Sequence, residues 1–156
     1  LKECGKRMYH RVVDTTCFTS LENLLEVTDN CEMFLVDLKV MDSQKHKEFT
    51  GVNNEKILSN IIELAKTNCE IIFRMPLIKG VNSDLINFER TAEFINSLEG
   101  NRTKINLLPY HKVAENKLVK MGRANDFFEF ETPNDHEISE IISTFKRYGI
   151  HASIGG

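Results

Sequence analysis

The feature that most constrains the fold is a set of short apolar runs that alternate with longer stretches of helical period. Four of the five runs are almost continuously apolar, as in EMFLVDL (32–38) and EIIFRMPL (70–77). Strands buried on both faces of a parallel sheet have this pattern, because neither face meets water. The predicted strands span residues 10–16, 32–38, 70–77, 104–110 and 150–154.

Apolar residues recur at helical spacing between the predicted strands. Residues 57–65 and 85–98 each place their apolar side chains on one face of a helix. A last helix is expected to begin after Asn134, an N-cap residue with Glu137 three positions later, and to end at Gly149. Alternating strands and helices predict a right-handed parallel α/β architecture.

Two parallel α/β layouts compete for this pattern. An open doubly wound sheet usually carries a glycine-rich nucleotide turn after a strand, and neither GxGxxG nor GxxxxGK[ST] occurs here. The barrel is therefore favoured, although a complete eightfold barrel takes about 250 residues. We expect residues 1–156 to form a single domain, a partial TIM-type (β/α) barrel of mainly parallel strands.

The N-terminal sequence LKECGKR starts without methionine. It is interpreted as the last turn of a helix that Gly5 closes as its C-terminal cap, and hence as a cut end. The chain is accordingly expected to be the C-terminal part of a barrel truncated at its N-terminus, with the missing strands before Leu1.

Charge and hydropathy exclude several classes of partner. The formal net charge is −3 and no long basic run occurs, so neither nucleic acid nor an anionic membrane is an expected partner. No apolar stretch approaches the roughly 20 residues of a membrane-spanning helix, and no signal-peptide layout opens the chain, which indicates a soluble cytoplasmic protein. The cysteines and histidines are scattered without metal-binding spacing. We expect buried thiols at Cys17, Cys31 and Cys69, and surface side chains at His10, His46 and His136.

Polar side chains gather at the C-terminal ends of the predicted strands. They are Asp14 and Thr15, Asp37 and Lys39, Arg74, and His111. In a parallel α/β barrel this rim holds the active site, which is built from residues of several strands. Asp37 and Lys39 have the same strand parity, so both side chains are expected on one side of the sheet if the strand continues to Lys39.

Each of these residues also has a structural explanation. Asp37 and Lys39 could form a salt bridge that closes the barrel mouth, and Arg74 could be the partner of an acid. His111 could bond a loop carbonyl, and the acid and threonine at the first strand end are also typical of a turn.

Three kinds of function are compatible with this set of residues. Burial would allow Lys39 to act as the Schiff-base lysine of a class I aldolase. Alternatively, the charged groups could grip a zwitterionic or nucleoside ligand by charge-assisted hydrogen bonds. A non-catalytic scaffold barrel is the third reading, and the strand pattern does not decide among them.

Several short motifs follow one another in a specific order. They are DLK (37–39), TGV (50–52), an arginine before PLIKGVN (76–82), and LLPYH (107–111). Each motif alone is weak, but the ordered set resembles the glycyl radical enzyme activating enzymes of the radical S-adenosylmethionine (SAM) superfamily, most closely those of pyruvate formate-lyase. The resemblance covers nearly the whole chain.

This resemblance implies a fold, cofactors and partners. Such enzymes are partial (β/α) barrels that hold a [4Fe-4S] cluster on a CxxxCxxC motif and bind SAM at the cluster. The cofactors generate a radical that takes a hydrogen atom from a glycine of a partner, pyruvate formate-lyase or a relative. Flavodoxin or ferredoxin is the implied electron donor.

The resemblance also implies roles for individual residues. Lys39 matches a lysine that contacts SAM, and His111 matches a histidine near the adenosine end. Arg74 matches a strand arginine expected to contact SAM or one of the acids. A monovalent cation beside the SAM carboxylate is implied at Asp14, Thr15 and Asp37.

Two departures from the family limit this expectation. The cluster motif and the GGE strand are absent, so no cysteine is carried over as an iron ligand. The chain alone is therefore expected to be inactive, with no cofactor tightly bound. Cys17 stands where the family has glycine, so the turn after the first strand is expected to differ.

Overall fold

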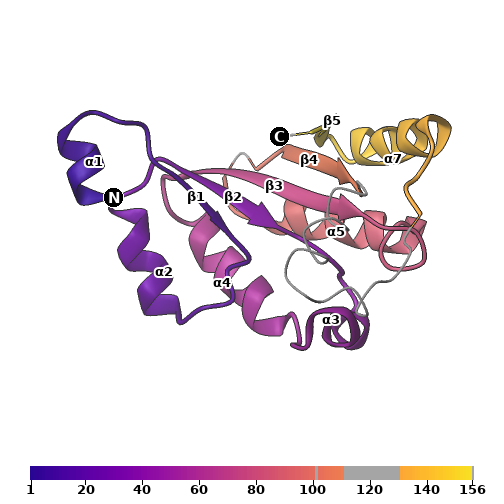
Figure 1. Cartoon of the computed structure of the whole chain (residues 1–156), viewed down its shortest axis with the longest axis horizontal. Helices are drawn as coiled ribbons and strands as arrows, with labels where there is room; N and C mark the ends of the chain where they lie inside the picture. Colours follow the sequence, from indigo (N-terminus) through magenta and orange to yellow (C-terminus); the bar gives the residue numbers. More distant parts are fainter. Residues whose placement is uncertain (101, 111–130, 156) are drawn as a thin grey trace, which may run out of the picture.

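Five parallel strands form a single sheet in the order β1-β2-β3-β4-β5 (Figure 1). The structure, a computed structural model, describes residues 1–100, 102–110 and 131–155. Because each strand pairs with the next one along the chain, the sheet grows in one direction, as in a (β/α) barrel, whereas a doubly wound sheet reverses its order. The strands are β1 (Val12–Thr15), β2 (Met33–Asp37), β3 (Glu70–Leu77), β4 (Lys104–Pro109) and β5 (His151–Ile154).

Helices lie between consecutive strands and cover one side of the sheet. Figure 1 shows α2, α4 and α5 along that side, while α7 lies beside β5 and packs against α5. The predicted parallel α/β architecture is confirmed, although apolar periodicity predicts α4, α5 and α7 and misses the short helices α2 and α3. The helices in the described part of the chain are α1 (Lys2–Lys6), α2 (Leu21–Thr28), α3 (Ser43–Thr50), α4 (Glu55–Ala65), α5 (Leu85–Ser97) and α7 (Asp135–Arg147).

Only one face of the sheet is fully buried. Alternate residues in the middle of β2, β3 and β4, such as Phe34 and Phe73, are 0% exposed, and the residues between them are half-buried. The expectation of strands buried on both faces is therefore wrong for the described chain. Leu35 and Ile72 make the runs look continuously apolar, yet they point to the side that the described helices leave open. We call this side the open face.

The hydrophobic core lies between the buried face of the sheet and the apolar stripes of α4, α5 and α7. Phe34, Phe73 and Phe145 are its largest fully buried side chains. The predicted helix faces are correct at most positions. Ile62 and Leu85 are exceptions, because they are exposed at the edge or the start of their helices.

The helix ends confirm two sequence predictions and correct a third. Glu137 N donates to Asn134 Oδ1 at 3.0 Å, and Asn134 N donates to Glu137 Oε2 at 2.7 Å, which completes the capping box. Gly149 follows α7 with φ 73°, a left-handed conformation that favours glycine. Gly5, however, lies inside α1, and the cap of that helix is Arg7.

The predictions for thiols and histidines are borne out only in part. Cys17, Cys31 and Cys69 are buried, as expected. The expectation of a surface position is wrong for His46, which is 4% exposed and whose Nδ1 lies 2.7 Å from Val52 O and 3.0 Å from Thr50 Oγ1. Within the described ranges no helix is both long and apolar enough to cross a membrane.

The capping box of α7 makes a testable contribution to stability. Asn134→Ala removes the acceptor for Glu137 N, and we expect it to lower the free energy of unfolding by about 1 kcal/mol. Asn134→Ser keeps a capping oxygen and should cost only a few tenths of that amount. Urea denaturation of both variants checks this, and equal losses would contradict a capping role.

An ion pair before β2 makes a pH-dependent contribution. Arg11 Nε lies 3.1 Å from both carboxylate oxygens of Glu32, and hydrogen bonding from the Arg11 side chain lowers the pKa of Glu32 to about 2. Because the folded state then binds the proton more weakly than the unfolded state, the stabilisation exists above the ordinary glutamate pKa of about 4.3. It is lost as the pH falls from there toward about 2.

The matching variant is Glu32→Gln, which cannot titrate at this position. We expect the wild-type protein to have the higher melting temperature at about pH 6, and the difference to shrink as the pH approaches about 2. Thermal denaturation of both proteins at several pH values measures it. A difference that stays constant with pH would show that the carboxylate contributes nothing through its ionisation.

Candidate functional site

Four charged side chains meet on the open face, at the C-terminal ends of β1 and β2 and at Arg74 in the middle of β3. Asp37 lies at the centre, because Arg74 Nη2 and Nε donate to its Oδ1 at 2.9 and 3.1 Å. Lys39 Nζ donates to the other oxygen, Oδ2, at 2.8 Å. Arg74 Nη2 also donates to Asp14 Oδ1 at 2.5 Å. We call these four residues the charged cluster.

Strand register explains why these residues meet. Asp37 and Arg74 are directly opposite in the parallel pairing of β2 and β3. Asp14 pairs with Leu35, two residues before Asp37, so both acids point to the same face and the guanidinium reaches both. β2 ends at Asp37, but Leu38 N still donates to Arg74 O at 2.9 Å, so the next residue continues the alternation and Lys39 returns to the open face.

The charges of the cluster cancel, and three of its four side chains are half-buried, whereas that of Asp14 is exposed. The charged cluster contains two carboxylates and two cations, and the side chains of Arg74 and Asp37 are 19% and 21% exposed. Burial lowers the pKa of Arg74, but hydrogen bonds and charge from Asp37 and Asp14 outweigh it, so the pKa is raised. The salt bridge between Asp37 and Lys39, one of the alternatives left open by the sequence, is present. A fixed positive charge therefore lies between two carboxylates at the barrel rim.

Thr15 does not join the charged cluster. Its partner in the register is Val36, on the buried face, and its Oγ1 accepts a hydrogen bond from Cys17 N at 2.9 Å. Cys17 has φ 59°, the left-handed conformation that glycine adopts most readily, and Asn60 Nδ2 donates to its carbonyl at 2.8 Å. The cysteine thus does not prevent a glycine-type turn. Burial raises the pKa of the Cys17 thiol to about 12, so it stays protonated.

The open face also carries polar residues that sequence reasoning missed. Asn106 of β4 is opposite Arg74, and Ser153 of β5 is opposite Asn106, so the polar row continues across the sheet. Ser153 Oγ lies 2.9 Å from Asn106 Oδ1. The sequence could have predicted Asn106, because it is a polar residue within an apolar strand and lies on the same face as Arg74. His111, the remaining predicted site residue, lies outside the described residues.

The chemistry of the side chains indicates what this face can bind. Ammonium, guanidinium and amide groups suit the carboxylate and hydroxyl groups of a zwitterionic or nucleoside ligand, and the open face carries all three kinds of group. In the described parts of the chain, no group of three or more His, Cys, Asp or Glu side chains could hold a metal ion. These residues therefore do not fit an iron–sulfur cluster.

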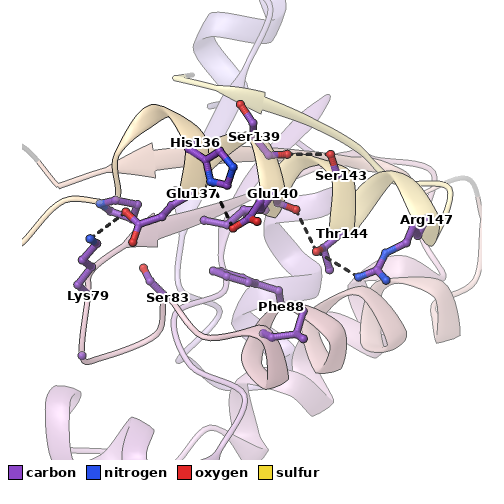
Figure 2. A pocket seen from close by; sticks show the side chains of 14 residues that line it. Lys79, Ser83, Phe88, His136, Glu137, Ser139, Glu140, Ser143, Thr144 and Arg147 are labelled. Atoms are coloured by element: carbon purple, nitrogen blue, oxygen red, sulfur yellow. Dashed lines mark hydrogen bonds and ion pairs between the residues drawn. The ribbon is translucent and has the colours of Figure 1, made fainter.

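A cavity of about 800 Å³ lies elsewhere, between α5 and α7. Figure 2 shows Lys79 pointing toward Glu137 at one end, where their charged atoms are 2.8 Å apart, and Arg147 beside Thr144 at the other. No member of the charged cluster lines this cavity. The charged cluster and this cavity are therefore two separate sites on the molecule.

Comparison with individual known proteins shows the family to which the chain belongs. No family model matches the chain. Over 155 residues it is 34% identical to the trans-4-hydroxy-L-proline dehydratase activating enzyme of Clostridioides difficile, an alignment that covers 98% of this chain and 51% of that protein. It is 30% identical to the 4-hydroxyphenylacetate decarboxylase activating enzyme of C. difficile strain CD196, and this alignment covers 99% of this chain and 49% of that protein. The chain spans about half the length of these curated relatives.

A solved structure matches over a larger share of its length. It is the crystal structure of a domain of pyruvate-formate lyase-activating enzyme from Bacteroides vulgatus ATCC 8482, with a TM-score of 0.84 and 40% identity. The match covers 99% of this chain and 86% of that one, so it includes the strands that carry the charged cluster. Sequence and fold agree, and the chain belongs to the family of glycyl radical enzyme activating enzymes in the radical SAM superfamily.

Proposed function

We propose that this chain acts within a longer activating enzyme, an oxidoreductase that uses SAM and a [4Fe-4S] cluster to generate a glycyl radical on a partner enzyme. The observation that carries the proposal is the pairing of Asp37 with both Lys39 and Arg74 at the barrel rim. Family membership supports it, because the named relatives are activating enzymes. In this proposal residues 1–156 form one domain, the C-terminal part of the barrel.

Each site residue has a proposed role toward SAM. Lys39 and Arg74 donate charge-assisted hydrogen bonds to the bound molecule, and His111 lies near its adenosine end. Asp37 orients the side chains of Lys39 and Arg74, since each of its carboxylate oxygens accepts a hydrogen bond from one of them. Asp14, Thr15 and Asp37 are proposed to hold a monovalent cation, Thr15 through its backbone because its side chain lies on the other face. Arg74 already places one positive charge between the carboxylates of Asp14 and Asp37.

The cofactors would supply the radical that removes a hydrogen atom from glycine. The side chains of this chain have a different task, which is to hold the ligand at the barrel rim. The open face would admit both SAM and the glycine segment of the partner. The partner class is a glycyl radical enzyme, with flavodoxin or ferredoxin as electron donor, in the cytoplasm.

Product analysis tests this function. The complete protein that contains this chain and the isolated chain are each incubated anaerobically with dithionite and SAM, and 5′-deoxyadenosine is measured by chromatography. We expect product from the complete, cluster-loaded protein and none from the isolated chain. A loaded protein that leaves SAM intact, or an isolated chain that cleaves it, would contradict the proposal.

A further inference from the structure

Three buried asparagines surround the segment that leads away from the charged cluster. Asn54, Asn82 and Asn87 are 3%, 1% and 5% exposed, and they come from the start of α4, the loop after β3 and the first turn of α5. Asn82 ends the PLIKGVN motif and Asn54 follows the TGV motif, and the site described above uses neither residue. All three side chains form hydrogen bonds with the backbone of residues 39–41. Asn87 also donates to the backbone of the loop after β3.

Asn82 connects the exits of the two strands that supply the charged cluster. Its Nδ2 donates to Lys39 O at 2.8 Å and to Pro76 O at 2.5 Å. Its Oδ1 accepts from Ile78 N at 2.9 Å. One amide therefore connects the backbone just after β2 with the C-terminal end of β3, two residues beyond Arg74.

The other two asparagines fix the residues that follow Lys39. Asn87 Oδ1 accepts from Met41 N at 2.8 Å, and Asn87 Nδ2 donates to Asn82 O at 3.0 Å. Asn54 Nδ2 donates to Val40 O and Met41 O, both at 3.0 Å. Buried backbone groups are costly when unpaired, and here side chains replace the sheet partners that end with β2.

From these contacts we infer that Asn82, supported by Asn87 and Asn54, is a positioning residue for Lys39. The sheet pairing of β2 ends at Asp37, so the asparagine amides, with one further bond from Leu38 N, set the backbone path that returns the lysine to the open face. The ligand-binding part of this inference rests on the proposed function, whereas the placement of Lys39 against Asp37 does not.

Asn82→Asp is the test variant, because it keeps the volume and removes the amide donor. Lys39 O and Pro76 O then face a carboxyl oxygen instead of an N–H. Asn60→Asp is the matched control. Asn60 is 5% exposed and its Nδ2 also donates to two carbonyl oxygens, those of Cys17 and Thr19, at the exit of β1.

The first measurement does not depend on SAM. The complete proteins are treated with acetic anhydride, and acylation of Lys39 is followed by mass spectrometry. We expect Asn82→Asp to speed acylation about tenfold, because a freed lysine leaves Asp37 more often, while Asn60→Asp leaves the rate unchanged. If Asn82→Asp does not fold, Asn87→Ala, which removes the acceptor for Met41 N, takes its place.

The second measurement is SAM affinity in a double-mutant cycle with Lys39→Met. We expect Asn82→Asp to weaken binding about tenfold in the wild-type background and to have little further effect once Lys39 is gone. A purely structural asparagine would cost the same in both backgrounds. Equal Lys39 acylation in wild type and Asn82→Asp would overturn the inference even if SAM binds. If wild type binds no SAM, the proposed function fails, and acylation alone decides the inference.

Discussion

Replacement of Arg74 by methionine is expected to lower the free energy of unfolding by about 2–3 kcal/mol. This value lies between the cost of breaking a buried ion pair, about 3–5 kcal/mol, and that of an exposed pair, below about 1 kcal/mol. The intermediate burial of Arg74 and Asp37 justifies it. The variant leaves two carboxylates facing each other without the guanidinium that now bonds both.

Urea denaturation measures this loss, and Arg90→Met is the matched control. Arg90 lies 3.9 Å from Asp42 in a pair whose side chains are 56% and 53% exposed, so its removal should cost less than about 0.5 kcal/mol. Equal losses in the two variants would show that the charged cluster behaves as an ordinary surface ion pair.

Replacement of Lys39 by methionine is expected to weaken SAM binding by the complete, cluster-loaded protein about 10- to 100-fold. A hydrogen bond from a charged donor is worth about 1.5–3 kcal/mol, which corresponds to this range. The fold should change little, because the lysine is half-buried and its stem can be replaced by that of methionine.

Calorimetry of SAM binding checks the Lys39 prediction. Lys47→Met is the control, since Lys47 is an exposed lysine in the last turn of α3 and lies outside the charged cluster. Unchanged affinity in Lys39→Met, with both variants folded, would remove Lys39 from the proposed site.

The aldolase alternative predicts that Lys39 forms a Schiff base with a carbonyl substrate, whereas the proposed function predicts no such adduct. A Schiff-base lysine must present a free amine, whereas Asp37 accepts a hydrogen bond from Lys39 Nζ at 2.8 Å. We expect borohydride to trap no carbonyl substrate on this residue. A reduced adduct at Lys39, located by mass spectrometry, would favour the aldolase mechanism.

Much of the fold could be predicted because strand signals here are local. Runs such as EMFLVDL combine apolar and β-branched residues over the length of one strand, and each predicted strand overlaps an observed one. The helices α2 and α3 were missed, because each has eight residues and a single buried side chain, Leu24 and His46 respectively. Two helical turns are shorter than the window over which apolar periodicity separates a helix from a loop.

The charged cluster could be predicted in part because parity is a property of sequence. Asp37 and Lys39 share a face by their spacing alone. That Arg74 bonds both acids required the register between strands, which no single segment contains. For the same reason Asn106 and Ser153 escaped notice, and nothing in the sequence marked the three asparagines as buried.

The measurement that tests the central claim most directly is EPR spectroscopy of the complete protein that contains this chain. It is expressed and reduced anaerobically, and spectra are recorded with and without SAM. The proposed function predicts a [4Fe-4S]⁺ signal that changes when SAM is added. An iron-free complete protein, or a signal that SAM does not alter, would contradict it.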